Sequence, residues 1–150
     1  MISSAPTPSE LPQAAARTLL FRVGNAIYGA DIDAVREVVP YRRPTRLPGA
    51  PPQIQGLMNL RGTIVTVVDL GVHLDPDRQP ARAGSILVAE ADTRLAGIVV
   101  DEVLDVRAVG SEASPDTAAT RDGVVSGLGH SAEQVVILID VPALVKHVLL

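Results

Sequence analysis

Three carboxylates stand close together in VDEVLDV, at Asp101, Glu102 and Asp105. Carboxylates that share a low-dielectric pocket shift one another's pKa, and many acid/base enzymes prepare a general acid in this way. Successive residues of a strand point to opposite faces, however, so Asp101 and Glu102 would not share a pocket. We therefore expect solvated carboxylates at a strand end. An acid/base enzyme that uses Asp101 and Asp105 ranks last among the alternatives.

The three histidines, His73, His130 and His147, are far apart in the sequence. None has a second histidine or a companion carboxylate at the spacing of a metal site. The segment GVVSGLG, Gly123 to Gly129, has the glycines of a phosphate loop but neither its lysine nor its glycine order. The sequence therefore predicts surface histidines, no metal and no cofactor.

A cluster of basic residues, Arg42, Arg43 and Arg46, follows Tyr41. Four prolines in YRRPTRLPGAPPQIQ would spread these side chains over a loop, and no recognition helix accompanies them. The formal charge of the whole chain is −4. We expect a charged rim of a binding surface and no nucleic-acid partner.

Arg61 lies in GLMNLRGTIVTVVDL, at the mouth of an almost wholly apolar run. Its planar guanidinium has five donors and could cap backbone carbonyls in a turn. An arginine at the edge of an apolar surface is also a common component of a protein-binding hot spot, because its stem packs while its head fixes orientation. The residues alone leave both interpretations open.

The chain of 150 residues has the length of one average domain and contains no cysteine. This composition excludes a disulfide framework and a thiolate metal site. The N-terminal segment MISSAPTPSELPQAAAR lacks the basic and apolar regions of a secretory signal, and the most apolar segment, VVILIDVPALVKHVLL, is interrupted by charges and proline. We expect a cytoplasmic protein with no direct membrane insertion.

Short valine-rich runs predict a mainly β protein. Gly24-Asn25 predicts the turn of one hairpin, and Arg61-Gly62 separates two further strands, IQGLMNL and TIVTVVDL. DIDAVREVV predicts one helical turn, capped by Asp31 or Asp33. Asp140 is expected to cap a final helix that has Pro142 in its first turn.

Two related halves are predicted by an internal repeat. The first half has residues that recur in the second at identical spacing, Gly29, Asp33, Val35 and Val38 matching Gly97, Asp101, Val103 and Val106. TVVDL, with Asp69, likewise matches ILIDV, with Asp140. We expect residues 1–17 to be a disordered lead-in, and residues 18–150 to be one domain of two intertwined β-subdomains that divide near residues 75–84.

The segment GLMNLRGTIVTVVDL resembles the signature G-x-x-N-L-R-G-x-[IV]-[LIV]-x-[IV]-[IV]-D-[LM] of CheW-like domains, the coupling proteins of bacterial chemotaxis. The surrounding segments LLFRVGNAIYGADIDAVREVV, RLPGAPPQIQG, LAGIVVDEV and VVILIDVPALV are similar to the family in the same order. The resemblance covers about Thr18 to Leu150. It implies two SH3-like five-stranded β-barrel subdomains with short helices, one of them at the C-terminus.

The resemblance also implies a non-enzymatic adaptor that joins the cytoplasmic tip of a methyl-accepting chemoreceptor to the regulatory domain of a CheA-type histidine kinase. By motif position, a receptor-binding groove between the barrels would contain Val35, Glu37, Val38, Arg61, Val99 and Val100. A kinase-binding surface on the first barrel would contain Leu47, Pro48, Ile54, Gly56 and Met58. An amphipathic helical hairpin needs such an apolar groove with a polar group at its edge.

Two alternatives to this function stay open. One is a CheW-like coupler of a non-flagellar receptor–kinase pathway, such as twitching or surface sensing. The other, ranked below it, is a small-ligand-binding β-barrel, which would need a closed apolar pocket.

Overall fold

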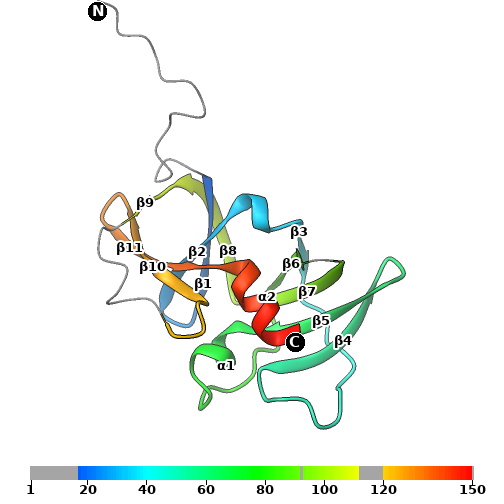
Figure 1. Cartoon of the computed structure of the whole chain (residues 1–150). Coiled ribbons are helices and arrows are strands. Elements are labelled where there is room, and N and C mark those ends of the chain that lie inside the picture. The colour runs from blue at the N-terminus through cyan, green and yellow to red at the C-terminus, as the bar shows by residue number, and fades with distance from the viewer. Residues whose placement is uncertain (1–16, 92, 112–119, 150) are drawn as a thin grey trace, which may run out of the picture.

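Strands dominate the computed structural model of the chain, which describes residues 17–91, 93–111 and 120–149 (Figure 1). The strands are β1 (Arg17–Val23), β2 (Ala26–Asp31), β3 (Glu37–Pro40), β4 (Ile54–Leu60), β5 (Thr63–Asp69), β6 (Ser85–Ala91), β7 (Arg94–Val100), β8 (Glu102–Ala108), β9 (Gly110–Ser111), β10 (Val125–Ser131) and β11 (Gln134–Ile139). The helices are the 3-10 turn η3 (Ile32–Ala34), α1 (Leu70–Leu74) and α2 (Val141–Leu149).

The local predictions for the first strands are confirmed. Hairpin β1–β2 turns at Gly24-Asn25, and the Asp31 carboxylate caps η3 by accepting from the N–H of Asp33 at 2.9 Å. The predicted lead-in, residues 1–17, lies outside the described residues except for Arg17, which begins β1. Among the helices that the described ranges contain, none is long and apolar enough to span a membrane.

One sheet, called barrel A below, has the strand order β8-β1-β2-β11-β10-β9. Its neighbouring strands are antiparallel except for β2 and β11, which are parallel. The two-residue strand β9 follows β8 in the chain and pairs with β10 at the other edge, Gly110 opposite His130. Because one continuous segment thus joins both edges, the sheet closes into an SH3-like barrel of five main strands.

The other sheet, barrel B, has the order β3-β6-β7-β5-β4, with a parallel pair β5–β7. It closes in the same way, since the segment after β3 reaches the opposite edge strand β4. There Thr45 and Leu57 exchange two backbone hydrogen bonds, of 2.7 and 2.8 Å. The expected pair of SH3-like barrels is confirmed.

Barrel B is built from one continuous stretch, residues 37–100, whereas barrel A takes its strands from both sides of that stretch. The expected division near residues 75–84 falls inside barrel B, between α1 and β6. It separates the two halves of the repeat, β1-β2-β3-β4-β5-α1 and β6-β7-β8-β10-β11-α2. In each half the third strand leaves its own hairpin and joins the other barrel, as β3 does beside β6 and β8 beside β1.

The predicted internal repeat is confirmed by the glycines at its matching positions. A Cβ placed on Gly29 of β2 would lie 2.7 Å from Cγ2 of Thr18, and a Cβ on Gly97 of β7 would lie 2.7 Å from Cγ2 of Ile86. Each glycine therefore allows a neighbouring β-branched side chain to cross over its backbone. The two barrels use the same packing at the same place.

Asp69 and Asp140, which match in the repeat, also take equivalent roles. Asp69 ends β5 and caps α1, accepting from the N–H of Val72 at 3.2 Å. Asp140 follows β11 and accepts from the N–H of Ala143 in α2 at 3.0 Å. Since an aspartate at this position satisfies an otherwise unpaired N–H, both caps stabilise the helix that follows.

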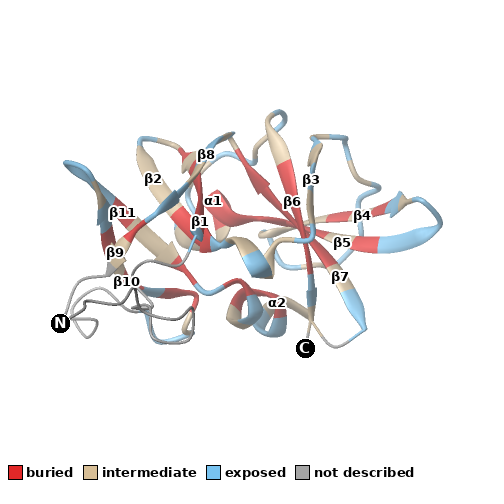
Figure 2. Cartoon of the chain, turned by 90° about the horizontal axis from the view of Figure 1, so that it is seen from above, coloured by how far each residue is buried: buried red, intermediate tan, exposed pale blue. Residues whose placement is uncertain are grey.

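The largest hydrophobic cluster joins both barrels to α2. Phe21 of barrel A and Leu87 of barrel B belong to it, and so do Leu144 and Val145 of the helix, and none of these side chains is more than 1% exposed. Figure 2 shows α2 beside the inner strands of both barrels, with exposed residues at the outer ends of the strands. The space between the barrels is therefore filled by the protein's own core.

Candidate functional site

Arg61 occupies the tip of hairpin β4–β5. Its φ is 49° and that of Gly62 is 86°, so the two residues form the turn in the left-handed region that tight hairpins favour. The N–H of Gly62 donates to Oδ1 of Asn59 at 2.8 Å, which closes the turn. A positive φ is unusual for a residue with a side chain and raises the question of what Arg61 contributes.

The matching hairpin of barrel A answers part of that question. Ala132, at the tip of β10–β11, has a φ of 54°, and within the described residues Arg61 and Ala132 are the two non-glycine residues with positive φ. Since alanine adopts a positive φ at the equivalent position, the backbone conformation of Arg61 does not require a guanidinium. The Arg61 side chain donates instead to Oε2 of Glu37, so the turn-capping interpretation is not supported.

The Arg61–Glu37 ion pair lies where barrel B closes on itself. Glu37 begins β3, at one edge of the sheet, and Arg61 extends from the hairpin of β4, at the other edge. The Arg61 side chain is 67% exposed and that of Glu37 is 30% exposed. Because of this exposure, a large part of the guanidinium remains available to a partner. Solvent-exposed ion pairs of this kind stabilise a fold by only about 0.2–1 kcal/mol.

The structure divides the predicted receptor-binding residues into two sets. Val38, on β3, is 43% exposed, and Val35, just after η3, is half-buried. Val99 and Val100 are each 1% exposed and cannot line a surface groove, which corrects the prediction. The reason is that β7 is an inner strand with both faces covered: Val99 packs inside barrel B, and Val100 packs in the core shared by the barrels.

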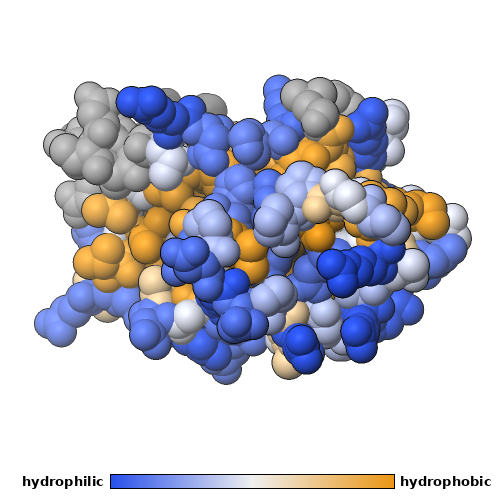
Figure 3. All heavy atoms as spheres, turned by 90° about the horizontal axis from the view of Figure 1, so that it is seen from below, coloured by the Kyte–Doolittle hydropathy of each residue, from blue (hydrophilic) through white to orange (hydrophobic). Residues whose placement is uncertain are grey.

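The segment between β3 and β4, residues 41–53, is called the proline-rich loop below. Of the predicted kinase-binding residues, Leu47 and Pro48 belong to this loop and Ile54 begins β4. They line a surface depression of about 780 Å³, together with Arg43 and Arg46 at its charged rim. Figure 3, which shows the molecule from below, has hydrophobic side chains gathered in patches between polar ones. This loop therefore presents apolar surface beside arginines, as the sequence predicts for a binding rim.

A second depression, of about 550 Å³, is lined by part of the same loop. Leu47 and Ile54 line it too, and Ile64 of β5 and the C-terminal residue Leu149 of α2 complete its apolar wall. Ile64 is 58% exposed, which is unusual for an isoleucine in a strand. The proline-rich loop thus contributes apolar surface to both depressions.

Gly56 and Met58, the other two predicted kinase-binding residues, are buried and do not reach this surface. Gly56 has a φ of 147°, and a Cβ there would lie 2.0 Å from the carbonyl oxygen of Thr45. It therefore permits the backbone bridge that closes barrel B, while the Met58 side chain, 7% exposed, packs inside that barrel. Both residues support the surface from below.

Buried Asp69 holds the base of the proline-rich loop. Besides capping α1, its carboxylate accepts from Gln55 Nε2 at 2.9 Å and from the N–H of Ala81 at 2.8 Å. Gln55 Oε1 in turn accepts from the Tyr41 hydroxyl at 2.7 Å. Burial raises the pKa of the Tyr41 phenol, which keeps this donor protonated. The network fixes both ends of the loop to β4 and β5.

The carboxylates Asp101 and Asp105 are held in separate ion pairs. Asp101 is partly enclosed, with a 21% exposed side chain, and accepts two 3.1 Å hydrogen bonds from Arg78 and one of 2.7 Å from the N–H of Gly24. The hydrogen bond from Arg107 lowers the pKa of the exposed Asp105. A general acid needs a raised pKa, so this arrangement does not favour the acid/base alternative.

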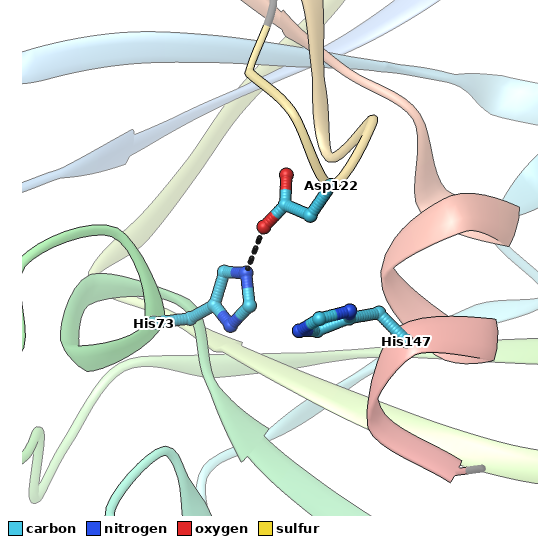
Figure 4. A group of neighbouring side chains, drawn as sticks. All are labelled: His73, Asp122 and His147. Carbon is cyan, nitrogen blue, oxygen red and sulfur yellow. Dashed lines mark hydrogen bonds and ion pairs between the residues drawn. The ribbon is translucent and has the colours of Figure 1, made fainter.

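The histidine prediction is confirmed for His147, which is exposed, but not for His73, whose side chain is only 7% exposed. His73 of α1 lies against His147 of α2, with ring centroids 5.4 Å apart, and His73 Nε2 is 3.0 Å from Oδ2 of Asp122 (Figure 4). The spacing in the sequence did not indicate this cluster, because three distant segments meet here. Burial would raise the pKa of Asp122, but hydrogen bonds from Thr120, the N–H of Val124 and His73 outweigh it and lower the pKa to about 2.

Comparisons with known proteins agree with this arrangement. The family model of the CheW-like domain matches residues 17–149. The chain is 36% identical to the chemotaxis protein CheW of Klebsiella aerogenes, over 85% of this chain and 80% of that protein. It is 32% identical to protein PilI of Pseudomonas aeruginosa, over 85% and 74% of the two chains.

A solved structure is similar as well. The scaffolding protein TtCheW from Thermoanaerobacter tengcongensis superposes with a TM-score of 0.69 at 27% identity, covering 84% of this chain and 89% of that one. The signature around Arg61, the two closed barrels and these matches lead to one conclusion: the chain belongs to the family of CheW-like domains.

Proposed function

We propose that the chain is a non-enzymatic adaptor that couples the cytoplasmic tip of a methyl-accepting chemoreceptor to the regulatory domain of a CheA-type histidine kinase. One observation carries the proposal: both barrels have a residue with positive φ first in the two-residue tip turn, and only barrel B places an arginine there, paired with Glu37 and still largely exposed. A side chain that the fold does not need is best explained by a partner. The adaptor would work in the cytoplasm, beside receptor arrays.

The receptor tip is expected to contact the edge of barrel B around Arg61, Glu37 and Val38, with half-buried Val35 behind them. A helical hairpin offers apolar side chains along one face and charged side chains at its borders. Exposed Val38 supplies apolar area, and the ion pair supplies one group of each sign to orient the visiting helices. Val99 and Val100 support this edge from the core.

The kinase regulatory domain is expected to bind the proline-rich loop, where Leu47, Pro48 and Ile54 surround the depressions described above. Leu47 is 43% exposed, and the arginines of the rim would meet acidic groups of the kinase. Two separate surfaces on one barrel allow both partners to bind together, which is what a coupling protein requires.

The closely packed interior of barrel B does not favour the alternative of a small-ligand-binding barrel. Val65, Val67, Ile86 and Val88, which face that interior, have no exposed surface. The described part of this barrel is packed with side chains, whereas a ligand-binding barrel needs an enclosed space.

The test of the receptor surface is co-sedimentation with receptor-containing membranes and kinase. Arg61→Glu should abolish it while leaving the circular dichroism spectrum and the unfolding midpoint nearly unchanged. The double variant Glu37→Arg with Arg61→Glu rebuilds the ion pair with reversed polarity. If the pair only closes the barrel, the double variant restores coupling, and the partner role of Arg61 is refuted.

A matched control comes from barrel A. There Asp105 is the repeat counterpart of Glu37, and it pairs with Arg107 on its own strand at 2.9 Å. Arg107→Glu changes the same charge on the other barrel and should leave co-sedimentation intact. A pull-down with the kinase regulatory domain tests the loop in the same way: Leu47→Asp should lose the kinase, and Val135→Asp, at a 62% exposed residue of barrel A, should retain it.

The pathway served by the adaptor is the remaining part of the proposal. The alternative of a non-flagellar pathway follows from the family resemblance, since CheW-like domains also serve other receptor–kinase systems, and the 36% identity to the chemotaxis protein CheW of Klebsiella aerogenes favours chemotaxis. Pull-downs with kinases from a flagellar and a non-flagellar system of the same cell would separate the two, and we expect the flagellar kinase to bind.

A further inference from the structure

Two helices that occupy equivalent positions in the repeat bring a histidine each to one place. His73 extends from α1 and His147 from the last turn of α2, and Asp122 enters between them from the segment before β10 (Figure 4). One ligand atom of each side chain lies within 4.8 Å of the other two. Three segments distant in sequence therefore present two imidazoles and one carboxylate to a common point.

The set is already oriented by the fold. The His73 side chain is only 7% exposed, so its ring has little freedom. The Asp122 carboxylate is fixed from behind, because its Oδ1 accepts from the Thr120 hydroxyl at 2.6 Å and from the N–H of Val124 at 3.0 Å. Outer hydrogen bonds of this kind hold the ligands of metal sites in position. Asp122 Oδ2 is left pointing at His73.

We propose that His73, Asp122 and His147 form a site for a divalent transition metal of the zinc class, which clamps α1 and α2 together where the two barrels meet. Imidazole nitrogens with one carboxylate suit Zn²⁺, Co²⁺ or Ni²⁺, whereas Ca²⁺ and Mg²⁺ prefer oxygen alone. The fourth position would be filled by water, since His147 is exposed.

The distances are compatible with this assignment. Ligands about 2.0–2.1 Å from a tetrahedral zinc ion lie about 3.4 Å from one another. His73 Nε2 and Asp122 Oδ2 are 3.0 Å apart and would accept the ion in place of the proton that they share. His147 must approach by up to about 1.4 Å, which a small rotation of an exposed side chain in a terminal helical turn provides.

A metal at this place would connect the halves of the repeat. α1 ends the first half, while Asp122 and α2 belong to the second, and α2 also fills the core shared by both barrels. The inference does not depend on the adaptor proposal, because none of the three side chains lines the depressions at the proline-rich loop or takes part in the Arg61–Glu37 ion pair.

The test is calorimetric titration of the tag-free full chain with zinc chloride, followed by thermal unfolding with and without the metal. We expect one zinc ion per chain and a midpoint of unfolding that rises with zinc concentration. His147→Gln and Asp122→Asn should each weaken zinc binding about tenfold or more, as loss of even an outer partner does in established sites. His130→Gln is the matched control and should bind zinc like the parent chain.

Cobalt provides a second readout that does not depend on stability. Co²⁺ held by these three ligands should give the visible absorption of a four-coordinate site, and His147→Gln should lose it. The proposal fails if the parent chain binds no zinc, if His147→Gln binds zinc as tightly as the parent, or if His130→Gln loses binding to the same extent. Calcium and magnesium chloride should leave the midpoint of unfolding unchanged.

Discussion

The two barrels share one frame and differ at a few positions. Gly29 and Gly97 admit similar close packing, and Arg61 and Ala132 both adopt a positive φ at the hairpin tips. The side chains at the tips are different, however, and so is the burial of the capping aspartates. The features that both barrels share, the glycine packing and the backbone at the hairpin tips, serve the fold. The features that differ, the tip side chain and the burial of the capping aspartate, indicate where barrel B has a candidate binding surface.

The capping aspartates make this difference concrete. Asp69 is 1% exposed and accepts hydrogen bonds from Gln55, Val72 and Ala81, so it fastens the proline-rich loop as well as α1. Asp140 is exposed, and its described side-chain bond goes to α2 alone. The aspartate at this position of the repeat therefore only caps a helix in barrel A, whereas in barrel B it also holds the base of a candidate binding surface.

The largest effect should come from breaking this contrast. Asp69→Ala should lower the free energy of unfolding by about 3–5 kcal/mol, because several donors around it are left buried and unpaired. Asp140→Ala should cost about 1 kcal/mol, the usual value of a helix cap. Urea unfolding of both variants measures the two costs. Equal costs would show that the buried network adds nothing to the cap.

The repeated glycines should show a smaller effect. Gly29→Ala and Gly97→Ala each push a Cβ into a β-branched side chain and should cost about 1–3 kcal/mol. The cost should be larger at Gly29, because a Cβ there would also lie 2.9 Å from Cγ1 of Val136, which is 0% exposed, whereas the second neighbour of a Cβ on Gly97, Val65, is 3.3 Å away. Thermal unfolding of the two variants decides this order, and a larger loss for Gly97→Ala would contradict it.

Stability and binding should separate at the hairpin tips. Arg61→Ala should lower the free energy of unfolding by no more than about 1 kcal/mol, because it removes an exposed ion pair at a backbone φ that Ala132 also adopts. Its binding to receptor membranes should nevertheless fall. Ala132→Arg, the reverse change on barrel A, should fold normally and gain no binding. A large loss of stability for Arg61→Ala would mark the arginine as structural.

The smallest expected effect concerns the change in folding stability at acidic pH. The pKa of Asp105 is lowered in the folded chain, mainly by Arg107, so its contribution to stability is present above the ordinary carboxylate pKa and disappears as the pH falls through the lowered value. Between neutral pH and about pH 3, Asp105→Asn should therefore lose slightly less stability than the parent chain. Urea unfolding at both pH values checks the sign, and a greater loss in the variant would contradict it.

Turns and helix starts were predictable because they depend on the residue types within a few neighbouring positions. Gly24-Asn25 and Arg61-Gly62 mark turns by residue type, and Asp140 followed by Pro142 marks a helix start. The exchange of β3 and β8 between barrels was not predictable, since valine-rich runs such as EVV and EVL pair equally well with several neighbours.

The candidate site was predictable only in part. Arg61 stood out as a charge beside apolar runs. Val99 and Val100 were assigned to the groove by motif position alone, which does not show that both faces of their strand are covered. His73, Asp122 and His147 carried no local signal at all. They approach one another only because α1 and α2 converge, which is a property of the whole fold.

The continuity of residues 37–100 has a consequence for synthesis of the protein. All strands of barrel B have left the ribosome once Val100 has emerged, so this barrel is able to close on the nascent chain. The β1–β2 hairpin, although made before barrel B, must wait for β8, β10 and β11. This hairpin therefore finds its partners later than the strands that follow it, and a premature stop after Val100 would leave it with an unpaired, aggregation-prone edge.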